Sequence, residues 1–150
     1  MATDLALAAL HHLLVFALTA MLVAQAVLLR GDLRADTVGR LAELDAGYGL
    51  TAGLLLAIGA CRVVFGIKGA DFYLHNPWFH AKVGAFVLVG LLSIIPTVRY
   101  ARWRKAQKTR PGFVPDAAAL AKTRTILRIE LAGLAVIFVL AAAMARYGGF

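Results

Sequence analysis

Side chains able to bind a ligand or move a proton recur within the apolar parts of this 150-residue chain. Imidazole nitrogen is a common ligand of haem iron, copper and zinc, whereas Arg and Lys bind carboxylates and other anions. A carboxyl group can act as a general acid or base. The residues concerned are His11, His12, Arg62, His80, Lys82 and Glu130.

Four long apolar stretches carry these residues. They cover about residues 5–29, 46–67, 79–100 and 126–146, and 61% of the chain is hydrophobic, more than in ordinary soluble domains. At about 1.5 Å of helix rise per residue, each is long enough to cross a hydrocarbon core of roughly 30 Å. Short connections make consecutive helices antiparallel. The sequence therefore predicts an all-α integral membrane protein, with one antiparallel four-transmembrane-helix bundle over residues 1–150 in a lipid bilayer.

The third stretch has aromatic residues at both edges. Trp78 precedes it, Tyr100 and Trp103 lie at its far end, and residues 83–98 between them carry no formal charge. Amphipathic aromatic rings gather at membrane–water interfaces. We therefore predict that these three side chains mark the two surfaces of the bilayer.

Two local signals predict how the helices pack and begin. Gly49 and Gly53 share one helical face, where small residues let a neighbouring helix backbone approach closely. Asp116 directly follows Pro115 and is a favourable N-cap. The last helix is therefore expected to begin near Asp116, in water, and to enter the membrane near Ile126.

Positive charge is concentrated between the third and fourth stretches. The chain has a net charge of +8, and residues 99–125 hold a single acidic residue, Asp116. Basic loops of membrane proteins stay on the cytoplasmic side. This predicts a multi-pass protein of the bacterial inner (plasma) membrane with loop 99–125 cytoplasmic and both termini external, and it argues against a nucleic-acid partner. Cys61 is the single cysteine, which excludes a disulfide within one chain.

This topology places the polar residues at two depths. The outer group comprises His11, His12, Arg62, His80 and Lys82, and the cytoplasmic group comprises Gln25, Asp45, Arg128 and Glu130. His11 and His12 point about 100° apart on a helix, so only one of them faces the interior, and the sequence does not decide which. Arg62 and Lys82 are also able to snorkel to the headgroups without any ligand.

The outer group fits two kinds of ligand. Haem b matches both of its chemistries, since iron takes imidazole and the anionic propionates pair with Arg62 or Lys82. A four-helix bundle can build such a site from facing helices. The alternative is a non-enzymatic carrier or accessory protein, with an anion or a divalent metal held by His11, His12 and His80. The sequence leaves both open, and homo-oligomerisation as well.

Three short motifs resemble the HemJ-type protoporphyrinogen oxidase family. They are Leu10-His11-His12-Leu13-Leu14, Trp78-x-His80-x-Lys82-Val83 and Arg128-x-Glu130, and the chain end, residues 145–150, resembles the family's short tail. The resemblance implies a haem b oxidoreductase acting on a porphyrin or a quinone. It implies Lys82 and Glu130 as catalytic candidates. Its cofactor-binding candidates are His11, His12 and His80, and the charge and depth of Arg62 add that residue to them.

Nearly the whole chain is also similar to a family of membrane proteins, DUF2214. The segments that carry this resemblance are residues 11–13 (HHL), 65–84 (FGIKGADFYLHNPWFHAKVG) and 91–103 (LLSIIPTVRYARW). The resemblance implies a membrane location and brings no settled function with it.

Overall fold

The computed structural model describes residues 2–31 and 33–147. Within them every element is a helix: α1 (Ala2–Leu28), α2 (Ala35–Phe65), α3 (Gly69–Leu74), α4 (Pro77–Thr109) and α5 (Ala117–Tyr147). Four of these helices are long and apolar enough to cross a membrane. The predicted all-α bundle of four transmembrane helices is therefore confirmed. Residues 148–150, the end of the tail compared above, lie outside the described residues.

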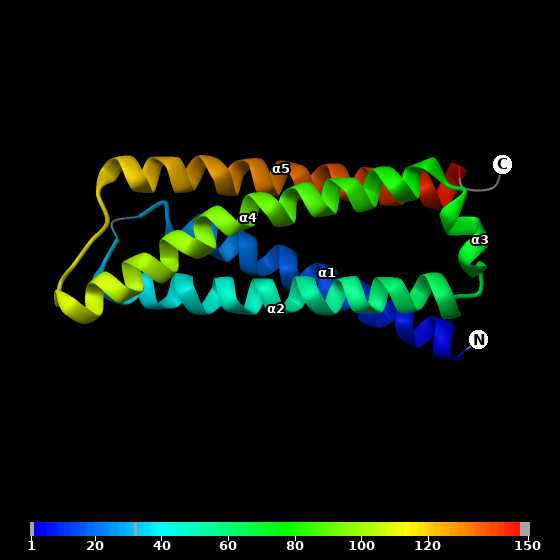
Figure 1. Ribbon diagram of the computed structural model, residues 1–150, viewed down its shortest axis with the longest axis horizontal. Coiled ribbons are helices and arrows are strands. Elements are labelled where there is room, and N and C mark those ends of the chain that lie inside the picture. Colours follow the sequence, from blue (N-terminus) through cyan, green and yellow to red (C-terminus); the bar gives the residue numbers. More distant parts are fainter. Residues whose placement is uncertain (1, 32, 148–150) are drawn as a thin grey trace.

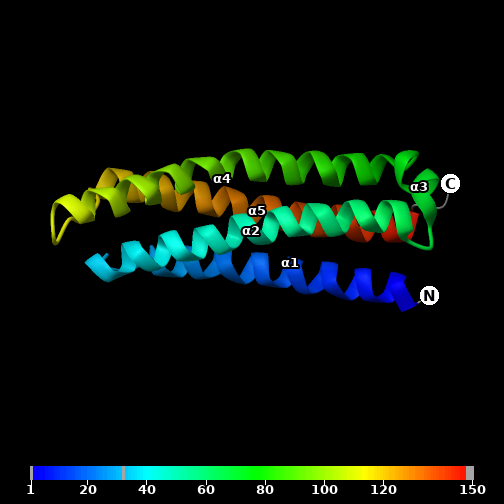
Figure 2. The same ribbon diagram turned by 60° about the horizontal axis from the view of Figure 1, so that its bottom comes forward.

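The four long helices form a bundle in which each packs against two neighbours. α1 contacts α2, α2 contacts α4, α4 contacts α5 and α5 contacts α1, whereas the described residues of the diagonal pairs make no comparable contact. Figures 1 and 2 show the chain reversing direction between consecutive long helices. The short α3 crosses one end, where α1 also begins and α5 ends (Figure 1). We call this the α3 end, and the opposite end, where α2 and α5 begin, the basic end.

Side-chain caps fix where α4 and α5 begin. The Trp78 N–H donates to Asn76 Oδ1 (2.9 Å), and Pro77 in the first turn has no N–H that needs an acceptor. The Ala119 N–H donates to Asp116 Oδ1 (2.7 Å). The predicted N-cap at Asp116 is therefore confirmed, and α5 begins at the next residue.

The buried core of the long helices occupies only the basic half of the bundle. On α1 no described residue before Leu18 is buried, and on α4 none before Val89. On α2 the last buried residue is Leu55, and on α5 it is Leu134. Because α1 and α4 begin at the α3 end while α2 and α5 finish there, the long helices have no buried side chains in that half. The buried Tyr73 and Asn76 of this half belong to α3 and to the turn after it. The helices are thus held together mainly near the basic end.

Two aromatic residues expected at the membrane surface belong to this core. Tyr100 is 1% exposed and Trp103 is 7% exposed, and their ring centroids lie 5.6 Å apart. Both rings belong to the hydrophobic core and pack between helices, and α4 continues beyond them to Thr109. The prediction of a membrane-surface position is therefore wrong for Tyr100 and Trp103, whereas the exposure of Trp78 agrees with it.

Close helix approach occurs at a glycine other than the predicted pair. A Cβ built on Gly49 or Gly53 would meet nothing within 4 Å, so this face of α2 packs against no other part of the described chain. A Cβ on Gly133 of α5 would instead collide with the Val89 side chain of α4. The Gly49–Gly53 prediction is therefore wrong for packing within the chain, and the contact that requires glycine is between α4 and α5.

Candidate functional site

His11 lies on the side of α1 that packs against α2. A Cβ on Gly59 of α2 would be 3.6 Å from His11 Cε1, so the absence of a side chain at Gly59 makes room for the imidazole. The His11 side chain is half-buried, and its Nδ1 is fully buried with no hydrogen-bond partner in the protein. His11 is therefore the histidine of the adjacent pair that faces the bundle, a choice that the sequence left open.

Two cationic side chains from other helices complete this cluster. Arg62 follows Gly59 by one turn on α2, and its buried Nε has no hydrogen-bond partner. Lys82 of α4 is half-buried, with Nζ 5.7 Å from the centre of the Phe79 ring, within the range of a cation–π contact. The charges of both residues act on His11, and that of Arg62 also acts on Lys82. Since α1 and α4 are diagonal in the bundle, His11 and Lys82 influence each other electrostatically across its interior.

The cluster of His11, Arg62 and Lys82, which we call the α3-half site, carries an excess of positive charge. Within residues 2–31 and 33–147 no carboxylate lies within ion-pair distance of Arg62 or Lys82. Asp4, at the start of α1, instead accepts a hydrogen bond from the Ile67 N–H through its Oδ1 (3.1 Å). The chemistry of the site is therefore that of an anion site with one imidazole ligand.

The other two predicted histidines, His12 and His80, bond to backbone carbonyl oxygens outside the α3-half site. His12 is exposed, and its Nδ1 donates to the Ala8 carbonyl oxygen of its own helix (2.6 Å). His80 is exposed as well, and its Nε2 donates to the Leu74 carbonyl oxygen (2.8 Å), which ties the start of α4 to α3. The described part of the chain contains no group of three His, Cys, Asp or Glu side chains placed to hold a metal ion. The expectation that His80 faces His11 is thus not met, because the last residue of α3 engages the His80 side chain.

A second cluster lies inside the basic half and draws on all four long helices. Glu130 of α5 is 1% exposed and Asp45 of α2 is 7% exposed, and the two carboxyl groups act on each other electrostatically. Tyr48 of α2 and Tyr100 of α4 are also buried, and both carboxyl groups act on them electrostatically. Gln25 of α1 is also buried. Glu130 Oε1, the Tyr100 hydroxyl and both amide atoms of Gln25 are buried without a protein hydrogen-bond partner.

The two proposed catalytic residues, Lys82 and Glu130, belong to different clusters. Gly133 of α5 lies against Val89 of α4, which fixes how these helices are aligned. Lys82 lies seven residues from Val89 toward the α3 end, and Glu130 lies three residues from Gly133 toward the basic end. At about 1.5 Å per residue the two are separated by about 15 Å along the bundle. They therefore do not act on the same small group.

Sequence reasoning missed the two tyrosines of the basic-half cluster. The sequence predicts an interfacial position for Tyr100 because it is an aromatic residue at the edge of an apolar stretch. Tyr48 carried a usable signal, since it lies three residues after Asp45 and residues with that spacing share a helix face. Arg128, by contrast, is exposed and turned away from Glu130's buried surroundings.

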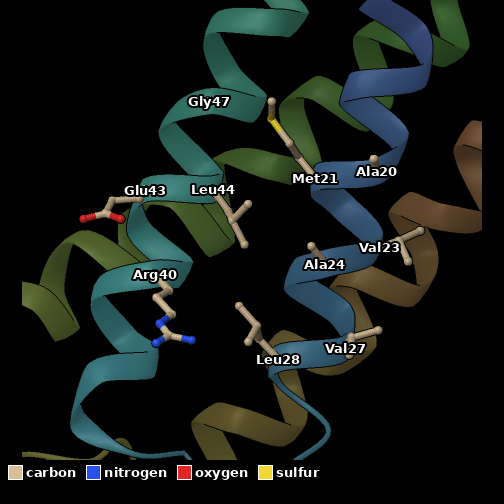
Figure 3. Close-up of a pocket in the computed structure, with 10 residues that line it drawn as sticks. All are labelled: Ala20, Met21, Val23, Ala24, Val27, Leu28, Arg40, Glu43, Leu44 and Gly47. Atoms are coloured by element: carbon tan, nitrogen blue, oxygen red, sulfur yellow. The ribbon is translucent and has the colours of Figure 1, made fainter.

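Two grooves of the described surface lie away from both clusters. One, of about 780 Å³, separates α1 from α2 in the basic half, and Figure 3 shows Arg40 and Glu43 as its charged rim on α2. The other, of about 210 Å³, lies between α4 and α5. Both are lined mainly by aliphatic side chains, several of them exposed, which suits contact with lipid acyl chains. We assign no function to them.

Four apolar helices around one buried and one half-buried polar cluster define a small multi-pass, helix-bundle membrane protein. The chain belongs to the family described as predicted membrane protein (DUF2214), whose family model matches residues 3–149. No curated protein and no solved structure matches the chain.

Proposed function

We propose that this protein binds haem b between its helices in the α3 half. The observation that carries the proposal is the buried Nδ1 of His11, which has no protein partner and lies in the half of the bundle without a fully buried core. A buried polar atom without a partner costs about 1–3 kcal/mol, so a ligand that approaches this imidazole is favoured. Haem b offers iron to the imidazole and a large apolar ring to the half-buried side chains around it.

The charges of the site fit the propionates of haem. Arg62 and Lys82 have no acidic partner among the described residues, and a carboxylate bound between them would form charge-assisted hydrogen bonds in a low dielectric. Because His80 is engaged by Leu74, His11 is the histidine of this site that would hold the iron. Bound haem would supply one-electron chemistry. The chain's own part is to hold the iron through His11 and to orient the porphyrin edge through Arg62 and Lys82.

The resemblance to the HemJ-type family supports an oxidoreductase that acts on a porphyrin or a quinone. Lys82 is the residue of its Trp78-x-His80-x-Lys82 motif that lies in the α3-half site. Glu130, about 15 Å away along the bundle by helix rise, would act on a separate step. By the distribution of basic residues we propose that the basic end faces the cytoplasm and that the α3-half site lies toward the outer face of the inner membrane.

The second candidate is a non-enzymatic carrier of a small anion. It is favoured by one observation, the turning of His80 toward Leu74, which leaves the α3-half site with two cations and a single imidazole. An anion without iron would neutralise Arg62 and Lys82 and needs no second ligand.

Absorption spectroscopy of the purified protein in detergent separates these candidates. With excess haem supplied, the wild-type protein is expected to bind about one haem per chain and to show a Soret band that shifts on reduction. His11→Ala is expected to lose this band. His12→Ala is the matched control, because the His12 side chain is exposed and bonds to a carbonyl oxygen of its own helix. This variant is expected to keep the band.

The cationic residues give a second test of the same site. Lys82→Met and Arg62→Met are each expected to weaken haem binding about tenfold, which is the loss of about 1.4 kcal/mol in a charge-assisted contact. Equal haem binding by wild type and His11→Ala would refute His11 as the ligand. A folded wild-type protein that binds no haem, but whose thermal stability rises with an added carboxylate or phosphate, would leave the anion carrier.

A further inference from the structure

The basic-half cluster has a charge balance that the haem proposal does not use. Facing Glu130, α2 contributes Asp45 and Tyr48, α4 contributes Tyr100, and α1 contributes the neutral Gln25. No lysine or arginine of the described residues forms an ion pair with either carboxyl. Two buried carboxyls without a counter-ion cannot both hold a negative charge at low cost. The cluster therefore calls for a bound positive charge.

Two arginines of the basic half bond to other groups. Arg99 of α4 is half-buried and acts on the Tyr100 hydroxyl, and its Nη1 donates to the Thr123 hydroxyl (2.9 Å). Arg124 of α5 donates from Nε to the Leu29 carbonyl oxygen at the end of α1. Both guanidinium groups are thus used to join helices at the basic end and neither neutralises Glu130.

The same Arg124 bond places Gln25 and Glu130 at similar levels along the bundle. Gln25 lies four residues before Leu29, toward the α3 end. Glu130 lies six residues after Arg124, in the same direction. At about 1.5 Å per residue their levels differ by only about 3 Å, and α1 and α5 are in contact. An unpartnered amide and an unpartnered carboxyl oxygen therefore lie at one level inside the bundle.

We propose that Glu130 and Asp45 form a proton-exchange site inside the membrane, at which Glu130 takes up a proton from water at the basic end by way of Asp45. Asp45 is the more accessible of the pair, at 7% against 1% exposure, and lies about 15 Å from the first residue of α2 by helix rise. In the step, hydronium becomes water and the Glu130 carboxylate becomes a carboxylic acid. No electron moves, and the Tyr100 hydroxyl and the Gln25 amide are available to hydrogen-bond either form.

This site is independent of haem. It lies at a different level from His11, which is fourteen residues from Gln25 on α1, or about 21 Å at 1.5 Å per residue. The leading competitor is a metal monocation held by the same oxygens, since hard cations also choose carboxylate, amide and hydroxyl oxygen. The two differ in whether binding follows pH or salt.

Infrared spectroscopy of the full-length protein in lipid nanodiscs tests the proposal without haem. The wild-type protein is expected to show a carboxylic-acid C=O band that disappears reversibly as pH is raised, that shifts in deuterated water, and that ignores sodium and potassium concentration at constant pH. Glu130→Gln is expected to lose one carboxylic-acid equivalent per chain. Glu43→Gln is the matched control, because Glu43 is an exposed residue two positions before Asp45, and it is expected to leave the band unchanged.

Three results would overturn the proposal. The first is a wild-type protein without such a band at any pH at which it stays folded, which decides the matter even where Glu130→Gln does not fold. The second is a band of full intensity in folded Glu130→Gln. The third is a band that responds to sodium at constant pH, which assigns the site to a metal cation. Asp45→Asn is expected to move the midpoint of the titration, and an unchanged midpoint would remove Asp45 from the site.

Discussion

Replacing Gly133 with Ala tests how closely α4 and α5 pack. The added Cβ would collide with a methyl group of Val89, a buried residue of the facing helix. Val is stiff, because in a helix its branched Cβ strongly favours one χ1 rotamer, so the methyl group cannot turn aside cheaply. The helices must then separate or strain, and overpacking of this kind costs about 1–3 kcal/mol.

The net loss of unfolding free energy in Gly133→Ala is expected to be smaller than this cost, because Ala is a better helix former than Gly. The gain from helix propensity is about 0.8–1 kcal/mol in a soluble helix. Gly90→Ala isolates that gain, since Gly90 is on α4, exposed, and a Cβ there would meet nothing within 4 Å. We expect Gly90→Ala to be neutral or stabilising and Gly133→Ala to be less stable than Gly90→Ala by about 1–3 kcal/mol.

The assay is reversible unfolding in mixed micelles, with helix content followed by circular dichroism. The double variant Gly133→Ala, Val89→Ala removes the colliding methyl group and is expected to recover part of the loss beyond the sum of the single changes. If Gly133→Ala stabilises the protein as much as Gly90→Ala does, the two helices are further apart than the structure has them. The alignment of α4 and α5, from which the separation of Lys82 and Glu130 was calculated, would then also be wrong.

Two further predictions concern the ends of the bundle. Asp116→Ala is expected to lower the free energy of unfolding by about 1 kcal/mol, because it removes the cap on the Ala119 N–H. Asp116→Asn can still accept that hydrogen bond and should lose much less stability. Equal losses in the two variants would show that the cap does not stabilise α5. In a Cys61→Ala background, a cysteine at the exposed Thr3 should react with an impermeant thiol reagent in intact cells and one at the exposed Lys108 should not, and the reverse pattern would invert the proposed orientation.

The fold was predictable because it depends on features that repeat along the chain. Apolar length predicted four membrane-crossing helices, and short connections predicted their antiparallel order. The cap at Asp116 was predictable because it acts within one helical turn. In a bilayer each helix must satisfy its own backbone hydrogen bonds, which ties the element type to local sequence.

The site was less predictable because it depends on which way each side chain faces. His11 and His12 are equivalent in type and depth, and only the contact of His11 with Gly59, on another helix, separates them. His80 lies in the expected motif, yet the turn from α3 supplies a nearby carbonyl oxygen that engages it. Tyr100 was expected to face the membrane surface but packs between helices, because the side of α4 that its neighbours cover is a tertiary property.

The uneven core explains why the α3 half is where a ligand matters. Lipid can replace helix–helix contacts at little cost, so the lack of buried aliphatic residues before Leu18 or after Leu134 does not by itself destabilise the bundle in a membrane. Polar atoms have no such substitute, since hydrocarbon cannot hydrogen-bond. Unfavourable free energy in the interior of this half therefore arises at polar groups such as the unpartnered His11 Nδ1 and Arg62 Nε, beside the charge of Lys82. A ligand that binds these groups would stabilise the folded protein as well as serve its function, and protein prepared with that ligand should unfold at a higher temperature than protein prepared without it.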